Sequence, residues 1–298
     1  MSAYFDAGRA PSSYALLVPD PAIPDEIFDH YEREVDESRR LFRGLNELEL
    51  VRTREIVERH LPSGHVRVLD VGGGTGVYAR WLAEAGHQVD LVDLMPHHVA
   101  AANGLADEGL AVQARTGDAR LLTEPDDSYD VVLLLGPLYH LTERADRVAA
   151  WREALRVAKP GAPVIAAAIS RFASLFSGLT FGVLFDPAFR AIVDRDLATG
   201  QHRNPGHVPE YFTTAYFHHP DEIAAEAAEA GAEVVEVVGV EGLAGWVRSL
   251  DDHWKDADSR AAILDSARAI EAEPTLLGLS AHLLCVARKP ARPTREPA

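Results

Sequence analysis

Short apolar segments alternate with longer segments between residues 66 and 169. The longer segments include several stretches with the periodicity of an amphipathic helix. The apolar segments lie at 66–71, 88–93, 111–116, 130–135 and 162–169. Mostly apolar strands separated by helices form parallel sheets whose two faces are covered by those helices. The alternation therefore predicts an α/β fold with a doubly wound, Rossmann-like sheet.

The rest of the chain does not follow this alternation. We expect a flexible N-terminus, an N-terminal helical lid and, after the fifth strand, a cap insert. Beyond the cap insert we expect the remainder of the core, which contains a second cap segment, and then a disordered tail. The boundaries are 1–23 for the N-terminus, 24–62 for the lid, 63–169 for the core, 170–218 for the cap insert, 219–290 for the remainder, with 241–275 as the second cap segment, and 291–298 for the tail.

Charge and cysteine content limit the classes of partner. The chain has 29 Lys and Arg residues against 46 Asp and Glu residues, a formal net charge of −17, and it has no basic stripe to attract phosphate backbones. No apolar run reaches the ~20 residues that span a bilayer, and the N-terminus lacks the pattern of a signal peptide. Cys285 is the lone cysteine, so an internal disulfide is excluded, and its apolar context HLLCVA predicts an inert core position. We expect a cytoplasmic protein without nucleic-acid or membrane partners.

Four glycines lie within five positions directly after the first apolar segment, in DVGGGTG (70–76). Glycine lets the backbone approach a ligand closely or adopt dihedral angles that other residues avoid. A dinucleotide-binding loop has the pattern G-x-G-x-x-G, but counting from Gly72 the third position is Val77. The chain instead has an acid at the end of the strand, Asp70, and a second acid, Asp93, at the end of the next strand.

This pattern resembles the first motif of class I S-adenosylmethionine-dependent methyltransferases. The similarity covers residues 64–170 and includes LVDL at 91–94, GDAR at 117–120 and ALRVAKPGAPVIAA at 154–167. Ala162 replaces the second glycine of the family's KPGG. From Tyr31 to the tail, the chain also looks like bacterial methyltransferases of largely unassigned substrate, with which it shares LLLGPLYHL and GQHRNP. The resemblance implies a sheet of seven strands, six parallel and the last antiparallel, and an enzyme of the EC 2.1.1 class.

The resemblance also implies which residues bind S-adenosylmethionine. The glycine loop would approach the methionyl and ribose parts, and Asp70 would meet the ammonium. Asp93 would accept hydrogen bonds from both ribose hydroxyls, and Asp118 would accept one from the exocyclic amine of adenine. Structural roles for Asp70 and Asp93, and helix capping by Asp118, are the alternatives. The complete predicted set is Tyr31, Asp70, Gly72, Gly74, Gly76, Asp93, Leu94, Asp118, Ala119 and Leu135.

The segment after the fourth strand, LGPLYH (135–140), is predicted to lie beside the acceptor. It lacks the acid-or-Asn, Pro, Pro, aromatic sequence of enzymes that methylate amino groups of DNA bases. It also lacks the carboxylate that the metal-dependent catechol enzymes have here, and one cysteine is too few for the cysteine-dependent classes. His140 is the candidate general base because it follows the carboxyl end of a strand; a structural histidine is the alternative. Tyr139 would line the methyl group or pack in the core.

The cap insert supplies further candidate acceptor-binding residues. It combines arginines and histidines with aromatic side chains, as small-molecule pockets do. The residues are Arg171, His202, Arg203, Tyr211 and His218. The arginines would bind a carboxylate or phosphate, or would instead pair with neighbouring acids. His218 and His219 are adjacent rather than spaced like metal ligands, so we expect no metal.

These observations predict a metal-independent enzyme that transfers the methyl group of S-adenosylmethionine to a small molecule and releases S-adenosylhomocysteine. The N-terminal helices, the cap insert and residues 241–275 would enclose the acceptor. The alternatives are an RNA or protein methyltransferase, a nicotinamide-dependent oxidoreductase and a cofactor-binding module without turnover. The sequence is compatible with a monomer or a homodimer.

Overall fold

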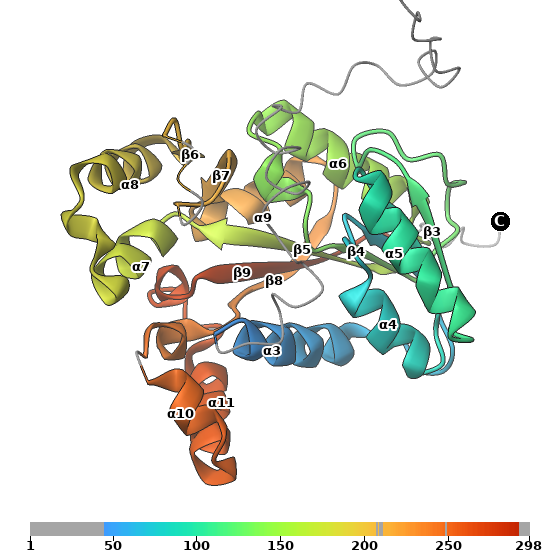
Figure 1. Cartoon of the computed structure of the whole chain (residues 1–298). Coiled ribbons are helices and arrows are strands. Elements are labelled where there is room, and N and C mark those ends of the chain that lie inside the picture. Colours follow the sequence, from blue (N-terminus) through green and yellow to red (C-terminus); the bar gives the residue numbers. More distant parts are fainter. Residues whose placement is uncertain (1–44, 207, 209–210, 248, 292–298) are drawn as a thin grey trace, which may run out of the picture.

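The computed structural model describes residues 45–206, 208, 211–247 and 249–291. Its centre is a mixed sheet of nine strands (Figure 1). Five strands lie in the parallel order β3-β2-β1-β4-β5, and β9 and then β8 extend the sheet beyond β5. The strands are β1 Arg67–Val71, β2 Gln88–Asp93, β3 Val112–Thr116, β4 Val131–Leu134, β5 Pro163–Ser170, β6 Gln201–His202, β7 Ala215–His218, β8 Glu233–Gly239 and β9 His282–Arg288.

The seven strands expected from the sequence are confirmed. β9 is antiparallel to both β5 and β8, so β8 runs in the same direction as β5, and only the last strand of the seven is antiparallel. The sequence does not predict β6 and β7. β7 pairs with β5 through two residue pairs, and β6 pairs with β7 through two. Such short strands contain too few residues to show a strand periodicity.

The order of the strands reverses at β1. From β1 the sheet continues to β2 and β3 on one side and to β4 and β5 on the other. The loops that leave the carboxyl ends of β1 and β4 therefore run to opposite sides of the sheet. Open α/β sheets bind ligands in the crevice that such a reversal creates.

Helices cover both faces of the sheet. α3 Leu45–His60, α4 Val77–Glu84 and α5 Pro96–Asp107 pack on one face, with Ile56, Leu82 and Ala102 in a shared apolar core. α6 Arg144–Val157 and α9 Pro220–Glu229 pack on the other, where Trp151 and Ile223 are buried. Figure 1 shows α3 and α4 below the sheet and α6 above it.

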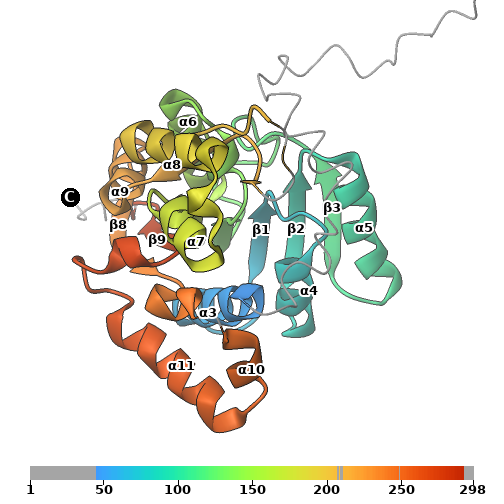
Figure 2. The ribbon, with the colours of Figure 1, turned by 60° about the vertical axis from the view of Figure 1, so that its left-hand side comes forward.

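The cap insert lies beyond the carboxyl end of β5 (Figure 1), and Figure 2 shows its yellow helices in front of the sheet. It contains α7 Ala173–Phe181, the 3₁₀ helix η2 Val183–Phe185 and α8 Pro187–Thr199, followed by the β6–β7 ribbon. A further 3₁₀ helix, η1 Leu138–His140, follows β4. Because β1, β4 and β5 are parallel, their carboxyl ends lie at one edge of the sheet, and the insert therefore stands next to the crevice there.

The second predicted cap segment is only partly a cap. It forms the 3₁₀ helix η4 Gly242–Trp246, then α10 Leu250–Trp254 and α11 Ala257–Ile270; the 3₁₀ helix η5 Leu277–Leu279 follows it and leads to β9. Leu250 and Trp254 pack with Leu48 of α3. The guanidinium groups of Arg52 and Arg59 in α3 pair with Glu271 at the end of α11. α10 and α11 thus pack against α3 below the sheet, whereas Glu241, Gly245 and Trp246 lie beside the cap insert.

Some predictions fall outside the described residues. They are the flexible N-terminus at 1–23, the part of the helical lid before Leu45, the cofactor contact of Tyr31 and nearly all of the tail. The described part of the predicted lid is α3, which buries Leu48, Ile56 and Val57.

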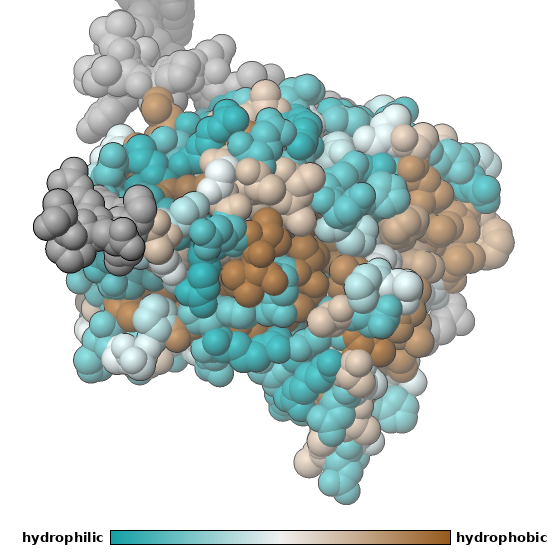
Figure 3. Space-filling view, turned by 180° about the vertical axis from the view of Figure 1, so that it is seen from behind, coloured by the Kyte–Doolittle hydropathy of each residue, from teal (hydrophilic) through white to brown (hydrophobic). Residues whose placement is uncertain are grey.

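The exposed surface and the lone cysteine complete the description of the fold. No helix among the described residues has the length and apolar character needed to cross a bilayer. Cys285 is buried in β9, and burial raises the pKa of its thiol to about 12, so it is an inert core residue. Figure 3 shows apolar side chains gathered on the back of the molecule. Exposed apolar residues include Val234 and Val235 of β8, Leu179, Phe181 and Phe185 of the cap insert, and Leu121, Leu243 and Val247 elsewhere.

Candidate active site

A cavity of about 210 Å³ lies at the carboxyl ends of the central strands. Its walls are the loops that follow β1, β2, β3 and β4, together with Phe212, Val240 directly after β8, and residues of α3, β5 and β9. Ten predicted residues are brought together here: Asp70, Gly72, Gly74, Asp93, Leu94, Asp118, Ala119, Leu135, Tyr139 and His140. The loops converge because parallel strands end at one edge of the sheet, so residues far apart in sequence meet there.

Glycines in the first loop have distinct roles. Gly72 has φ 72°, and a Cβ at this position would lie 2.7 Å from Cδ of Pro137 in the loop after β4. Gly74 has φ 57°, and its missing side chain would meet no atom within 4 Å, so this part of the backbone faces open space. Gly76 does not line the cavity. Its Cβ would lie 2.9 Å from Cδ1 of Leu105, so this glycine allows α4 to pack closely on α5.

The carboxylate of Asp70 is fully buried next to the glycine loop. Neither of its oxygens has a hydrogen-bond partner among the described residues. Burial, and to a smaller extent the nearby Asp93 carboxylate, raises the pKa of Asp70 to about 7. An unpaired buried carboxylate is unfavourable, and a cationic group placed beside it would stabilise the charged form. The ammonium group of S-adenosylmethionine has the required charge.

Asp93 connects the first two loops. Its Oδ2 accepts a hydrogen bond from the Gly74 amide (2.9 Å), and its Oδ1 accepts one from the Met95 amide (2.8 Å). His98 Nδ1 lies 3.1 Å from Oδ1. A carboxylate has about four acceptor sites, so Asp93 retains capacity for hydroxyl groups of a ligand. Asp93, the open space at Gly74 and the unpaired Asp70 fit the ribose and methionyl parts of S-adenosylmethionine.

Asp118 is held by its neighbour Arg120. Its carboxylate accepts hydrogen bonds from the Arg120 amide (2.8 Å) and from Nη2 of Arg120 (2.7 Å). No helix begins here, so the alternative of helix capping does not describe Asp118; its bond to the Arg120 amide closes a turn instead. Leu94 and Ala119 line the cavity beside it, and Leu135 lines the side next to β4.

His140 and Tyr139 belong to η1 and also line the cavity. Their ring centroids lie 4.7 Å apart, and the His140 ring lies 6.1 Å from that of Phe212. Phe212 has φ 63°, in the left-handed region that residues with a side chain rarely adopt. Such strain is often found at ligand sites, where the surrounding structure holds it in place.

A second cavity of about 270 Å³ lies between the cap insert and η4. It shares the lining residues Glu49, Ile169, Phe212 and His282 with the first cavity. His202 and Tyr211 line only this second cavity. His202 is fixed by Asp196 (2.9 Å) and by the Tyr211 carbonyl (2.8 Å), so it shapes the wall. In the second predicted cap segment, the lining residues among those described are Glu241, Gly245 and Trp246.

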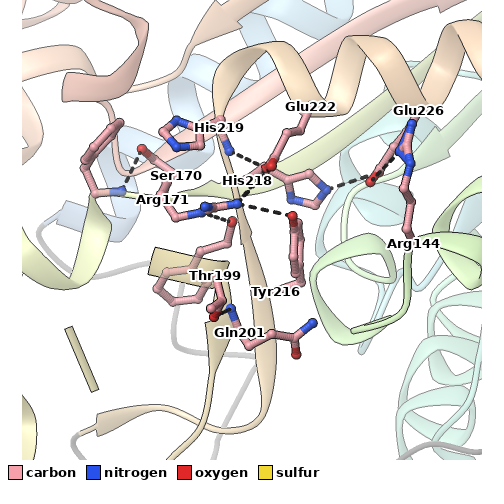
Figure 4. A network of polar contacts seen from close by, with 12 residues as sticks. Arg144, Ser170, Arg171, Thr199, Gln201, Tyr216, His218, His219, Glu222 and Glu226 are labelled. Carbon is pink, nitrogen blue, oxygen red and sulfur yellow. Dashed lines mark hydrogen bonds and ion pairs between the residues drawn. The ribbon is translucent and has the colours of Figure 1, made fainter. Parts of the chain in front are cut away.

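The structure does not bring Arg171 or His218 to either cavity. Figure 4 shows both side chains among polar partners instead. Nη2 of Arg171 pairs with Glu222 at 2.8 Å, and its Nε donates to the Phe217 carbonyl at 2.7 Å. His218 is fully buried, and its Nε2 lies 3.2 Å from Glu226. Both side chains join the cap insert to α9, because acids of that helix meet them.

Arg203 also lies outside both cavity linings. Its guanidinium donates to the His202 carbonyl (2.8 Å) and to Oε1 of Gln201 (2.6 Å). These contacts hold the β6–β7 ribbon. The predicted anion-binding roles of Arg171 and Arg203 therefore have no geometric support, since both guanidinium groups are engaged within the protein.

The sequence does not single out Glu49, Glu241 and His282. One ligand atom from each of them lies within 4.8 Å of the others, as a metal site would need, but in the structure the imidazole is hydrogen-bonded to Glu241 at 2.5 Å. Glu241 follows β8 and His282 begins β9. Because β9 is antiparallel, its first residue lies at the same sheet edge as the carboxyl ends of the parallel strands. In the sequence, the polar residues at the ends of these two strands were the signal that could have indicated this cluster.

The raised pKa of Asp70 makes cofactor binding dependent on pH. In the ligand-free protein the pKa of Asp70 is higher in the folded state than in the unfolded state, so folding is coupled to proton uptake between these two values. The stabilisation from this proton uptake is lost as the pH rises from the unfolded pKa of about 3.9 to the folded pKa of about 7. The cofactor's ammonium group pairs with the charged form, so affinity should increase several-fold from about pH 6 to about pH 7.5 and then level off. Calorimetric titrations should show this increase, and Asp70→Asn should remove it. The same pH dependence in Asp70→Asn would contradict the ammonium contact.

Known proteins that are similar to this chain include methyltransferases. Residues 68–161 match the family model described as a methyltransferase domain. A ubiquinone biosynthesis O-methyltransferase from Azorhizobium caulinodans is 29% identical over 206 residues, 66% of this chain and 74% of that protein. One from Hahella chejuensis is 36% identical over 133 residues, 44% of this chain and 54% of that protein. A ubiquinone/menaquinone biosynthesis C-methyltransferase from Azotobacter vinelandii is 28% identical over 173 residues, 56% of this chain and 64% of that protein.

Solved structures share the fold. An S-adenosylmethionine-dependent methyltransferase from Mesorhizobium loti has a TM-score of 0.54 at 18% identity, covering 81% of this chain and 99% of that one. The N-methyltransferase NodS from Bradyrhizobium japonicum, in complex with S-adenosyl-L-homocysteine, has a TM-score of 0.53 at 17% identity, covering 89% of this chain and all of that one. The sheet and its flanking helices therefore have the architecture of these proteins.

Proposed function

We propose that this chain, which is a class I S-adenosylmethionine-dependent methyltransferase, transfers the methyl group to an oxygen atom of a small molecule. Two of the relatives described above are O-methyltransferases of ubiquinone biosynthesis, which supports oxygen as the methylated atom. The observation that supports a small molecule as the acceptor is the second cavity. It shares lining residues with the cofactor cavity and lies under the cap insert and η4.

The residues of the site would divide the work of methyl transfer. S-adenosylmethionine supplies a methyl group on a positively charged sulfur. Asp70 and Asp93 would hold its ammonium and ribose, and the open backbone at Gly74 would accept its close approach. Holding the acceptor in line with the methyl group contributes up to ~7–11 kcal/mol to such reactions. Tyr139 and His140 line the cofactor cavity, and the His140 ring lies 6.1 Å from that of Phe212, which lines both cavities. From there His140 would position the acceptor or take its proton.

Cofactor binding is tested first, and turnover is tested second. S-adenosylmethionine should raise the melting temperature, whereas NADH and NADPH should not. The protein should then release S-adenosylhomocysteine when it is incubated with phenols and other small hydroxyl compounds. Cofactor binding without any release would support a binding module, and release only with RNA or protein would support a macromolecule methyltransferase.

His140→Ala should separate binding from turnover. We expect unchanged affinity for S-adenosylmethionine, because the carboxylates and glycines that bind it remain. Turnover should fall about tenfold or more, since the acceptor loses a positioning contact or its base. Steady-state kinetics and calorimetry on the same preparation measure both. Full activity would exclude His140 from the site.

A further inference from the structure

An imidazole–carboxylate pair lies where the two cavities meet. His282 lines both cavities, and its Nδ1 is 2.5 Å from Oε1 of Glu241. The His282 side chain is 26% exposed, whereas that of Glu241 is 3% exposed. The pair therefore has a buried carboxylate on one side and an imidazole that reaches the cavities on the other.

Glu241 is held in place by further hydrogen bonds. Its Oε2 accepts from Oγ of Ser280 (2.8 Å) and from the His282 amide (3.1 Å). Burial would raise the pKa of Glu241, but His282 and the hydrogen bonds from Ser280 and the His282 amide outweigh burial and lower it. Glu241 is thus an ionised acceptor, so the hydrogen it receives must be on Nδ1 of His282. The proton-free nitrogen of a neutral His282 is then Nε2.

A second carboxylate stands near the same imidazole. Oε2 of Glu49, from α3, lies 3.9 Å from Nδ1 of His282. Two carboxylates beside one imidazole stabilise its protonated form. One carboxylate therefore orients this histidine, and two carboxylates favour its positively charged form. A general base has these features.

The second cavity is suited to an aromatic acceptor. Aromatic side chains form much of its lining, and its polar side chains include Glu49, two serines and the pair just described. Such cavities bind largely apolar molecules and orient them through a small number of polar contacts. The aromatic lining residues are Phe181, Phe189, Tyr211, Phe212, Phe217 and Trp246.

We propose that His282 is the general base for an aromatic hydroxyl group bound in the second cavity, and that Glu241 is its positioning residue. Nε2 of His282 takes the hydroxyl proton, and the oxygen lone pair forms the new bond to the methyl carbon. The electron pair of the broken carbon–sulfur bond remains on sulfur, and the imidazolium later releases its proton to water. His140 then positions the acceptor. This inference rests on the proposed function, since it assumes that the first cavity binds the methyl donor.

The test uses 4-nitrophenol, whose phenolate absorbs visible light. The full-length protein is saturated with S-adenosylhomocysteine, and 4-nitrophenol is added at a pH where the free compound is mostly neutral. We expect bound 4-nitrophenolate in the wild type. His282→Gln should bind 4-nitrophenol without the phenolate band. Glu241→Gln, which keeps a hydrogen-bond acceptor but not the charge, should weaken the band and raise the pH at which it develops. His253→Gln, an exposed histidine on α10, is the matched control and should behave as wild type.

The outcomes distinguish this inference from the proposed function. Two results would overturn the role of His282 and leave the cofactor assignment standing, provided that S-adenosylhomocysteine binds normally. One is an equal phenolate band in His282→Gln. The other is the absence of 4-nitrophenol binding in the wild type. Loss of S-adenosylhomocysteine binding in the wild type would overturn the proposed function. A band that disappears after dialysis against EDTA and returns with Mg²⁺ or Zn²⁺ would make the cluster a metal site and would also overturn the inference. With any phenol found to be methylated, His282→Gln should lower turnover about 10²-fold and remove the acidic limb of the pH profile.

Discussion

Glu226→Ala is expected to lower the free energy of unfolding by about 3–5 kcal/mol, the cost of breaking a buried ion pair. The Glu226 side chain is 1% exposed, and it accepts hydrogen bonds from Nε (2.9 Å) and Nη2 (2.7 Å) of Arg147, whose side chain is 2% exposed. Burial would raise the pKa of Glu226, but the hydrogen bonds from His218 and Arg147 outweigh it, so Glu226 stays ionised. Alanine would leave the Arg147 guanidinium buried without a countercharge.

Glu229→Ala is the matched control for this prediction. Glu229 lies on the same helix, and it pairs with Arg144 at 2.7 Å on the surface, where both side chains are about half exposed. Exposed pairs contribute about 0–1 kcal/mol, so this variant should be nearly as stable as the wild type. Urea unfolding of both variants gives the comparison. Equal losses would show that the buried pair between α6 and α9 does not carry the predicted stability.

The double variant Arg147→Met with Glu226→Ala separates the charge from the packing. If the cost of Glu226→Ala comes from the uncompensated guanidinium, removal of that group should recover part of the lost stability. The recovery should be incomplete because Arg147 also donates to the carbonyls of Leu141 and Thr142 (2.9 Å each) and lies over the Tyr216 ring. No recovery would indicate that Glu226 acts mainly through His218.

The positions of the candidate cofactor-binding residues could be predicted from the sequence because their signals are local. β2 ends at Asp93 in both the prediction and the structure, and the glycine loop directly follows β1. Each of these residues stands at the carboxyl end of a parallel strand, and the alternation of strands and helices fixes that position without knowledge of tertiary contacts. The same logic placed His140 after β4.

The acceptor half depends on contacts between distant segments. Glu241 and His282 meet because β8 and β9 pair in the register Gly239↔Leu283, which no local pattern specifies. Arg171 carries the charge expected of a substrate-binding residue, but Glu222 of α9 meets it in the folded chain. A sequence shows that an arginine is present, whereas only the fold shows which acid pairs with it.

Asp93→Ala is expected to weaken S-adenosylmethionine binding by about 1–3 kcal/mol, or about 5- to 150-fold in Kd. The carboxylate would have two roles. It holds the Gly74 and Met95 amides through hydrogen bonds of 2.9 and 2.8 Å, and it would accept hydrogen bonds from the ribose hydroxyls. Alanine removes the charged acceptor and leaves both amides without this partner. Isothermal titration calorimetry measures the loss.

Asp90→Asn is the control for Asp93→Ala, because Asp90 lies on the same strand but away from the cavity. Its carboxylate accepts from Arg67 (2.6 Å) and from the Tyr129 hydroxyl (2.8 Å), so the change should affect stability and leave cofactor affinity unchanged. Asp93→Asn should fall between wild type and Asp93→Ala, since an amide keeps one acceptor oxygen and loses the charge. Wild-type affinity in Asp93→Ala would mean that the ribose lies elsewhere. The carboxyl end of β2 would then serve only to hold the loops together.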